Sequence, residues 1–269
     1  MNLQNDDIRF YLVVGIAAMM LLFISFLIIF IFSQRKRIQY QNSLQSLKET
    51  QQFQLIDAAV RSEETERHRI AEELHDEVGA ILSSTKLHVY GIGTDYMDEY
   101  HQVLHKKCTA LLDDAIIKVR GISHNLHSSI LKEFGLNEAI KHFANKLNSE
   151  LIEVTTDLDY GYITIDHKDD INVYRIIQEL INNTLKHANA SKINIGSQYK
   201  NKILTMTISH NGEGLTQTVF EELRYKKDGL GLKNIQNRAI LLKSDILFSK
   251  TATGYKIDIL VPRNETVDD

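Results

Sequence analysis

The chain has 269 residues, which allows one or two domains rather than several. Its formal net charge of -4 argues against direct nucleic-acid binding, because general nucleic-acid binders are usually basic. The single cysteine, Cys108, excludes an intrachain disulfide and a metal site built on cysteine pairs. One proline in the whole chain favours long uninterrupted helices.

Residues 10–32 form an uncharged and strongly apolar segment. As a helix, this segment rises about 34 Å, enough to cross a membrane core of roughly 30 Å. A signal peptide is the alternative, but the apolar run is too long and its basic residues follow it. Because residues 35–37 are all basic, the positive-inside rule predicts a single-pass protein of the cytoplasmic (inner) membrane. Residues 1–9 are then extracytoplasmic, and the remainder lies in the cytoplasm.

Residues 33–64 contain neither glycine nor proline, and most of their side chains are polar. Sparse apolar positions indicate a helical linker that pairs as a short parallel coiled coil. A single solvated helix is the alternative. The apolar positions are Tyr40, Leu44, Leu47 and Leu55.

Residues 65–130 predict a hairpin of two amphipathic helices, separated by Gly91 and Gly93. The second helix is expected from Asp98 to Leu126. A lone hairpin cannot cover its own apolar face, so we expect a homodimer with a four-helix bundle. The predicted buried stripe of the first helix is Ile70, Leu74, Val78, Ile81 and Thr85.

Beyond Gly135 the periodicity alternates between helix and strand, so residues 131–263 predict an α+β domain with helices on one face of a mixed sheet. The polar tail, residues 264–269, is expected to be flexible. Helices are expected over residues 136–151, 168–187 and 231–242. Strands are expected over residues 154–158, 192–199, 203–209, 246–250 and 255–261.

Three groups of residues are candidates for chemistry. His75 lies one step from the apolar stripe, and the adjacent Asp76 can hold one ring nitrogen protonated, leaving the other nucleophilic. An ordinary surface histidine is the alternative. Glu179 and Asn183 share a helix face, and Lys186 and His187 follow one turn later. Such a face suits hydrated Mg²⁺ with phosphates, although a plain polar face is the alternative.

Two glycine-rich loops form the third group. Glycines at the end of a strand permit close approach of the backbone to a ligand, and a glycine-rich entry into a helix suits phosphate. Each loop alone is weak evidence, because most such loops are turns. The residues are His210, Asn211, Gly212 and Gly214 in the first loop, with Gly229, Gly231 and Leu232 in the second.

The order and spacing of these motifs are more specific than any one of them. Residues 65–263 resemble a bacterial sensor histidine kinase of the short subclass that pairs with LuxR/NarL-type response regulators. Residues 69–76 resemble its phosphoacceptor box, residues 119–127 with 134–139 its second helix and domain junction, and residues 179–188 its Asn-bearing box. The resemblance implies a dimerisation hairpin followed by a GHKL-type α/β sandwich that binds ATP.

The resemblance also implies a role for each candidate. His75 would take the γ-phosphoryl group of ATP, and Asp76 would orient the imidazole and accept its proton. Asn183 would bind Mg²⁺, with Glu179 as acid/base or holder of a metal-bound water. Lys186 and His187 would lie near the phosphates. The loop residues named above would shape the nucleotide pocket and its lid, residues 215–228.

This chain departs from the family pattern at three positions. His210 stands where an aspartate normally binds adenine, which puts adenine recognition in doubt. Ala80 stands where a glutamine is associated with phosphatase activity, and Gly254 is followed by Tyr255 where threonine is usual. The main rival is therefore a degenerate kinase that acts as a membrane-bound scaffold. Another ATPase of the same fold is disfavoured by the membrane span and the histidine-bearing hairpin.

Overall fold

The computed structural model describes residues 3–94, 97–126, 129–164, 166–223 and 230–263. Residues 1–55 and residues 56–269 form two compact units. Helix α1 runs from Leu3 to Glu73 and contains the one described stretch that is long and apolar enough to cross a membrane. The expected tail, residues 224–228 of the expected lid and Gly229 lie outside the described residues.

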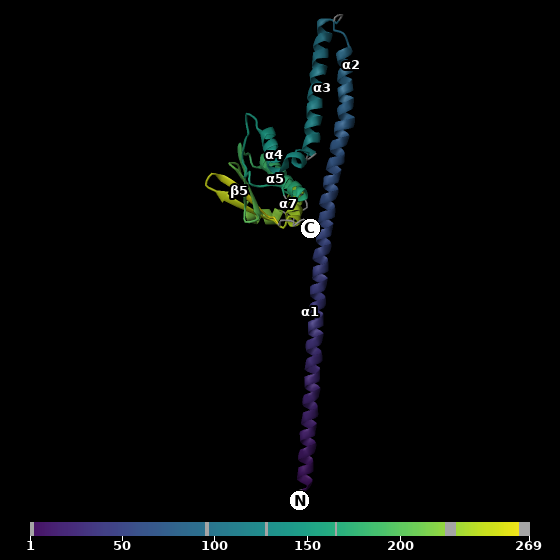
Figure 1. Ribbon diagram of the computed structural model, residues 1–269, viewed down its shortest axis with the longest axis vertical. Helices are drawn as coiled ribbons and strands as arrows, with labels where there is room; N and C mark the ends of the chain where they lie inside the picture. Colours follow the sequence, from purple (N-terminus) through teal and green to yellow (C-terminus); the bar gives the residue numbers. More distant parts are fainter. Residues whose placement is uncertain (1–2, 95–96, 127–128, 165, 224–229, 264–269) are drawn as a thin grey trace. The chain divides into compact units, whose positions relative to one another are not determined.

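The predicted hairpin is confirmed, with one feature that the periodicity did not indicate. A π-helical turn, η1 (Leu74–Val78), is followed by α2 (Gly79–Gly91) and α3 (Glu99–Leu126). The Ser123 hydroxyl donates to the Ala71 carbonyl at 2.9 Å and joins α3 to the end of α1. Figure 1 shows α2 and α3 side by side.

The stripe predicted on the first helix is not buried within one chain. Val78 is 37% exposed and Ile81 is 65% exposed. A single hairpin has only two helices with which to cover these side chains, so part of its apolar face stays open.

The second part of unit 56–269 is a two-layer α/β sandwich. Its five-stranded sheet has the order β1-β2-β3-β5-β4, in which only β1 and β2 are parallel. The strands are β1 (Glu153–Asp157), β2 (Lys192–Lys200), β3 (Ile203–His210), β4 (Asp245–Thr251) and β5 (Gly254–Pro262). The helices are α4 (Ser129–Leu147), α5 (His167–His187), α6 (Gln217–Leu223) and α7 (Leu230–Leu241).

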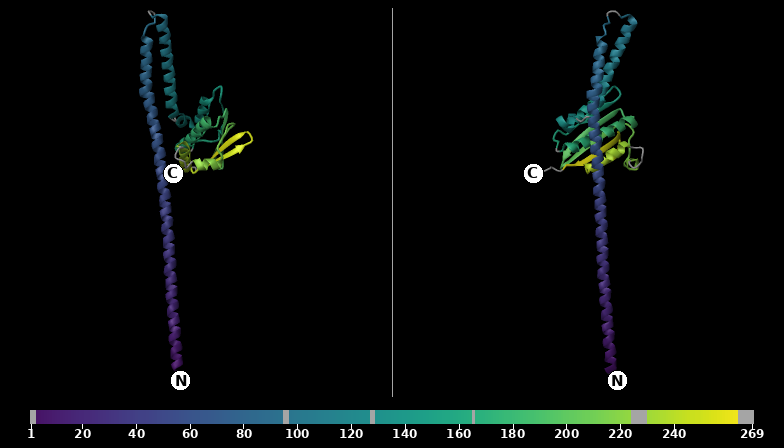
Figure 2. Two further views of the ribbon diagram at one scale, coloured as in Figure 1. Left: turned by 180° about the vertical axis from the view of Figure 1, so that it is seen from behind. Right: turned by 90° about the vertical axis from the view of Figure 1, so that its right-hand side faces the viewer.

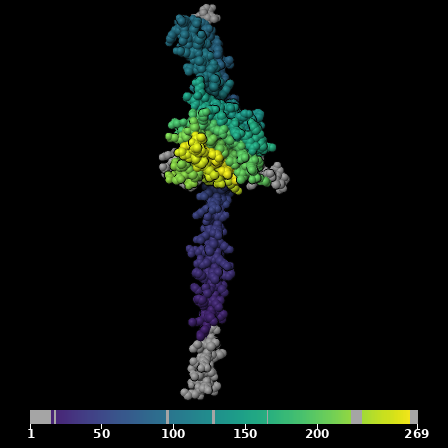
Figure 3. All heavy atoms as spheres, turned by 90° about the vertical axis from the view of Figure 1, so that its left-hand side faces the viewer, coloured from purple at the N-terminus to yellow at the C-terminus, as the bar shows by residue number. Residues whose placement is uncertain are grey.

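Alternation along the strands decides which face of the sheet is covered. In β3, Leu204, Met206 and Ile208 are buried, and the residues between them are partly exposed. The buried side chains meet the apolar side of α5, and Figures 1 and 2 show the helices gathered on that face. On the other face, drawn in Figure 3, Thr207 donates to Asp258 at 2.7 Å. This pattern is that of a GHKL-type sandwich, as the resemblance implied.

Two details differ from the sequence expectation. The helix expected over residues 136–151 ends at Leu147, because the Asn148 side chain accepts from Val154 N and donates to Val154 O. These bonds start the connection to β1 instead of another helical turn. Helix α6 was not expected, because residues 215–228 were assigned to a lid. Gly135, with φ of 81°, confirms a break where the periodicity changes.

A buried polar cluster fixes the start of α5 to the end of β5. Asp170, fully buried, accepts from Tyr162 Oη and from Arg263 Nη2, both at 2.5 Å. Arg263 also donates to Asp169 at 2.9 Å. Burial raises the pKa of the Tyr162 hydroxyl, and the hydrogen bond and negative charge of Asp170 add to this shift. Tyr162 therefore remains protonated and keeps donating.

We expect Asp170→Ala to lower the free energy of unfolding by about 3–5 kcal/mol, because the buried Arg263 loses its enclosed counter-charge. The matched control is Asp169→Ala, whose side chain is 40% exposed. This control should lower the free energy of unfolding by about 1 kcal/mol or less. Denaturant unfolding of both variants, followed by circular dichroism, measures the difference. Equal losses of unfolding free energy in the two variants would contradict the role of Asp170 as the enclosed counter-charge of Arg263.

Candidate active site

The largest cavity described in the α/β sandwich has a volume of about 570 Å³. It lies between the second half of α5, the end of β3 and the start of α7. A volume of this size suits a nucleotide-sized ligand. Seven of the predicted site residues line it: Glu179, Asn183, His187, His210, Gly214, Gly231 and Leu232.

Helix α5 presents the oxygen ligands of the cavity. Its apolar side is buried against the sheet, so Glu179 and Asn183 point away from the core on one face. Asn183 Nδ2 lies 3.5 Å from Glu179 Oε1, at the limit of a hydrogen bond. This leaves the amide oxygen of Asn183 available as a ligand. No cluster of three His, Cys, Asp or Glu side chains able to hold a metal occurs among the described residues.

These donors fit Mg²⁺ that arrives with ATP. Mg²⁺ keeps several waters and takes one or two protein oxygens together with substrate phosphates, so it needs no cluster of protein ligands. One amide oxygen and one carboxylate beside a cavity of nucleotide size meet that requirement. Asn183 and Glu179 would hold the ion there, and its charge would neutralise part of the charge of the phosphates.

Glycines bring two loops close to α5. A side chain at Gly231 would overlap the carboxylate of Glu179, and one at Gly212 would overlap the backbone at Ala188 and Ala190. Gly212 therefore requires the absence of Cβ, because the backbone at Ala188 and Ala190 cannot move aside, whereas a side chain at Gly231 would displace the carboxylate of Glu179. The first contact places the start of α7 directly against Glu179.

His210 is the unusual member of the cavity wall. It is 7% exposed, and its Nδ1 is buried without a hydrogen-bond partner among the described residues. Its ring stacks on Tyr255 with centroids 6.0 Å apart and an interplanar angle of 14°. Burial lowers the pKa of the His210 imidazole below its ordinary value, so the ring is neutral at pH 7. A neutral imidazole can accept or donate a hydrogen bond, according to its tautomer.

Three predicted pocket residues do not line the cavity. Asn211 Oδ1 accepts from the backbone N–H groups of Ser191 and Lys192 at 3.0 and 2.9 Å, which fixes the turn between α5 and β2. Gly212 acts through backbone packing, and Lys186 is exposed on α5. Gly229 falls outside the described residues.

The proposed nucleophile lies on a distorted helix. His75 and Asp76 are exposed within η1, where the Gly79 N–H donates to the Leu74 carbonyl five residues earlier. Short π-helical turns occur often at functional sites. The spacing of apolar residues in the sequence did not indicate this π-helical turn, because the apolar stripe also fits an ordinary α-helix.

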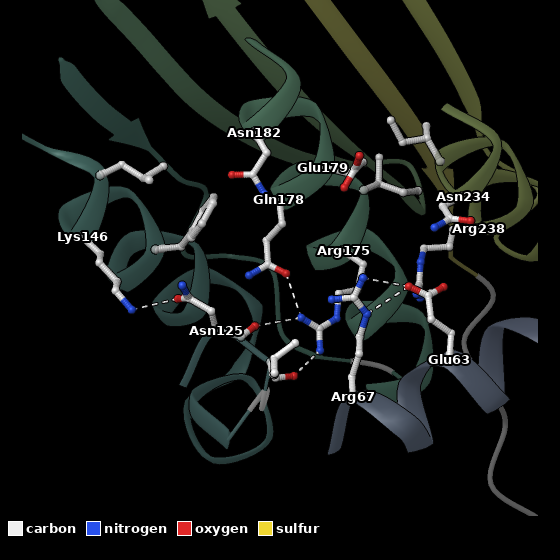
Figure 4. A pocket seen from close by; sticks show the side chains of 15 residues that line it. Glu63, Arg67, Asn125, Lys146, Arg175, Gln178, Glu179, Asn182, Asn234 and Arg238 are labelled. Carbon is white, nitrogen blue, oxygen red and sulfur yellow. Dashed lines mark hydrogen bonds and ion pairs between the residues drawn. The ribbon is translucent and has the colours of Figure 1, made fainter. Parts of the chain in front are cut away.

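A second cavity, of about 280 Å³, lies on another side of α5 and was not anticipated from the sequence. Figure 4 shows its polar lining, including Arg175, Arg238 and Glu63. Glu179 lines both cavities. A charged residue among the apolar positions of an amphipathic helix, such as Arg175, was the available signal, but its partner Glu64 lies 111 residues away in the sequence.

Comparison with known proteins gives one match for the helical hairpin and another for the α/β domain. Residues 66–131 match the family described as histidine kinase. Residues 168–265 match the family described as histidine kinase-, DNA gyrase B-, and HSP90-like ATPase. Together the two segments account for more than half of the 269 residues.

Curated relatives are sensor proteins. The sensor histidine kinase MctS of Rhizobium johnstonii is 28% identical over 219 residues, which are 78% of this chain and 46% of the relative. The sensor protein VraS of Staphylococcus aureus is 28% identical over 211 residues, 75% of this chain and 57% of the relative. The chain thus spans about half the length of the curated relatives it matches.

Among solved structures, the histidine kinase domain of the Erythrobacter litoralis EL346 blue-light activated histidine kinase has a TM-score of 0.44 and 14% identity. The match covers 75% of this chain and 94% of that one. With the phosphoacceptor hairpin and the ATPase domain matched in this order, the chain belongs to the sensor histidine kinases, in the NarL-associated subclass.

Proposed function

We propose that this chain is a membrane-anchored, homodimeric sensor kinase that phosphorylates His75 with Mg-ATP and passes the phosphoryl group to a response regulator of the LuxR/NarL type. The observation that carries the proposal is the cavity that gathers Glu179, Asn183, His187 and His210 beside glycine-dependent contacts. The kinase part lies on the cytoplasmic side of the proposed span. The apolar face left open on the hairpin supports pairing with a second copy.

The proposed reaction transfers the γ-phosphoryl group from ATP to a ring nitrogen of His75. The bond from the β–γ bridging oxygen to phosphorus breaks, a nitrogen–phosphorus bond forms, and ADP leaves. Asp76 would hold the imidazole in the tautomer whose free lone pair attacks and would accept its proton. Asn183 and Glu179 would hold Mg²⁺ and its water, and His187 and Lys186 would lie near the phosphates. Positioning and charge neutralisation dominate such a step.

The second step moves the phosphoryl group from His75 to an aspartate of the regulator. An exposed position within η1 supports this role, because a separate protein has to reach the phosphohistidine. His210 is the residue that favours the alternative of a degenerate, scaffolding kinase, because a buried imidazole in the cavity wall departs from the family pattern. Measured ATP binding separates the two.

We expect the full-length protein, in detergent micelles with γ-labelled ATP and Mg²⁺, to gain an acid-labile and base-stable label. His75→Gln should abolish this label. Asn183→Ala should reduce it by about tenfold or more, as expected when a Mg²⁺ ligand is lost. The matched control is His88→Gln, which removes an exposed histidine of the same helical hairpin. Equal labelling of the His75→Gln protein would show that another residue accepts the phosphate.

We expect ATP binding that weakens as pH falls through the titration of His210, below its unperturbed value of about 6.5. The affinity for ATP falls at low pH because neutral imidazole can accept a hydrogen bond from the adenine amino group, whereas imidazolium cannot. His210→Asp should bind ATP more tightly and prefer it over GTP, since a carboxylate only accepts hydrogen bonds. His210→Asn carries no ionisable ring, so it isolates the contribution of His210 from that of the other polar groups in the same cavity, which include His187 and Glu213.

Calorimetric titration with ATP and GTP between about pH 5.5 and about pH 8, which brackets the ordinary titration range of histidine, measures these differences. A flat profile in the wild type and unchanged affinity in His210→Asp would show that His210 does not contact the base. Absence of ATP binding at every pH would favour the scaffold alternative.

We expect the protein to hydrolyse its phosphorylated regulator slowly, because the methyl group of Ala80 cannot orient an attacking water. Ala80 is exposed just beyond η1, so it is not occupied in packing and can face a regulator. Ala80→Gln should speed phosphate release by at least about tenfold, because the amide would hold the attacking water in a productive orientation. Labelling of His75 should barely change. Rapid release by the wild-type protein, measured without ATP, would contradict this expectation.

A further inference from the structure

Two arginines of the ATPase domain are buried although each carries a positive charge. The side chains of Arg175 on α5 and Arg238 on α7 are 4% and 3% exposed. Within the domain they donate to neutral acceptors, Gln178 Oε1 and Asn172 Oδ1, each at 2.9 Å. Neutral acceptors do not balance two buried charges, so this surface requires carboxylates from elsewhere.

The carboxylates come from one turn of α1. Glu64 accepts two hydrogen bonds from Arg175, at 3.0 and 2.5 Å, and Glu63 accepts one from Arg238 at 3.1 Å. Paired bonds between an arginine and a carboxylate fix orientation as well as distance. Figure 4 shows Glu63 lying between Arg238 and Arg67, which also donates to it.

The charge of Glu64 is stable at physiological pH. Burial alone would raise the pKa of Glu64, but the hydrogen bond and charge of Arg175, with the charges of Arg238 and Arg67, hold it below its ordinary value. The contribution of Glu64 is therefore present above the ordinary glutamate pKa and is lost only as pH falls below it. Glu64 therefore does not bind a proton near neutrality, and its contacts with Arg175 persist there.

Arg175 also ties the acidic turn to the end of the hairpin. Its Nη1 and Nη2 donate to the carbonyls of Asn125 and Leu126, at 3.2 and 2.7 Å. These carbonyls belong to the last turn of α3, where acceptors lack helical partners. One guanidinium thus joins α5 of the ATPase domain to both α1 and α3.

These contacts are offset from the proposed phosphoacceptor. Glu63 and Glu64 precede His75 by 12 and 11 residues, roughly 16–18 Å along a helix. Glu179 lines the same cavity as Glu63, and no described residue of η1 lines that cavity or the nucleotide cavity. In a parallel dimer the partner's phosphoacceptor would lie at the same height, so pairing does not remove the offset.

We propose that Arg175 and Arg238 form a docking surface for the acidic turn Glu63–Glu64, and that this docking holds the ATPase domain in a resting position away from His75. The inference rests on the proposed function, which assigns the roles of His75 and Glu179. A helix turns about 100° for each residue, so a modest rotation of α1 carries both carboxylates away from the arginines. The docking surface thereby links the state of α1 to access of the ATPase domain to His75.

The test is the double variant Glu63→Gln with Glu64→Gln in the full-length protein. The initial rate of His75 labelling should rise by about tenfold or more, because release of a docked state raises an active population that was at most roughly 10%. Calorimetric ATP affinity should stay unchanged, since neither glutamate lines the nucleotide cavity. The matched control, Asp57→Asn, removes a carboxylate of the same helix from an exposed pair with Arg61 and should leave the rate unchanged.

A charge exchange provides the converse variant. Arg238→Glu should also raise labelling, and adding Glu63→Arg should return it toward the wild-type rate. An unchanged or lower rate in the glutamine double variant, with ATP affinity preserved, would overturn the proposal. A lower rate would mean that the contacts between the acidic turn and the two arginines belong to the active state.

A distance measurement separates failure of docking from failure of the proposed kinase activity. Spin labels at Ala59→Cys on α1 and Lys233→Cys on α7, in a Cys108→Ser background, report docking without any phosphorylation. The wild-type glutamates should give one narrow distance distribution, and the glutamine double variant a broad one. Identical distributions would overturn docking. Narrow and broad distributions without any labelling of His75 would leave docking intact and reject the kinase assignment.

Discussion

The burial of one side of α5 against the sheet is the constraint on which the site depends. Val173, Ile176, Ile177 and Leu180 lie in the core, so the polar residues between them have only the remaining sides of the helix to occupy. Glu179 then faces both the nucleotide cavity and the cavity beside α1. A single helix thus lines both the cavity proposed for ATP and the surface where the ATPase domain meets the hairpin.

The same constraint explains why polar contacts here are so closely paired. Arg175 lies on the helix between core positions and is therefore buried with its charge. Burying an unpaired charge is costly, so the structure supplies Glu64 and two helix-end carbonyls. Nearer the start of the same helix, Asp170 meets Arg263 in a similarly enclosed pair. The first half of α5 is thereby held by two arginine–carboxylate contacts that join distant segments.

The sequence predicted the elements of the ATPase domain well, because their signals are local. The alternation of Leu204, Met206 and Ile208 identified β3 before any contact was known, and it appears directly in the burial pattern. Glu179 and Asn183 could be placed together because residues four apart share a helix face. The contacts of Arg175 with Glu64 could not be predicted, because 111 residues separate them and no periodicity connects them. The π-helical turn could not be predicted for another reason, because its apolar residues fit an α-helix equally well.

Helix α1 continues through η1 into α2 without a break, so the residues before His75 form one helical path. Along such a path each inserted or deleted residue turns everything beyond it by about 100°. A heptad insertion changes the angle by only about 20°. Fusions of foreign input modules to this kinase would therefore be sensitive to the phase of the junction. Chimeras whose junctions differ by seven residues should present the hairpin in nearly the same direction, whereas those that differ by one or two should not.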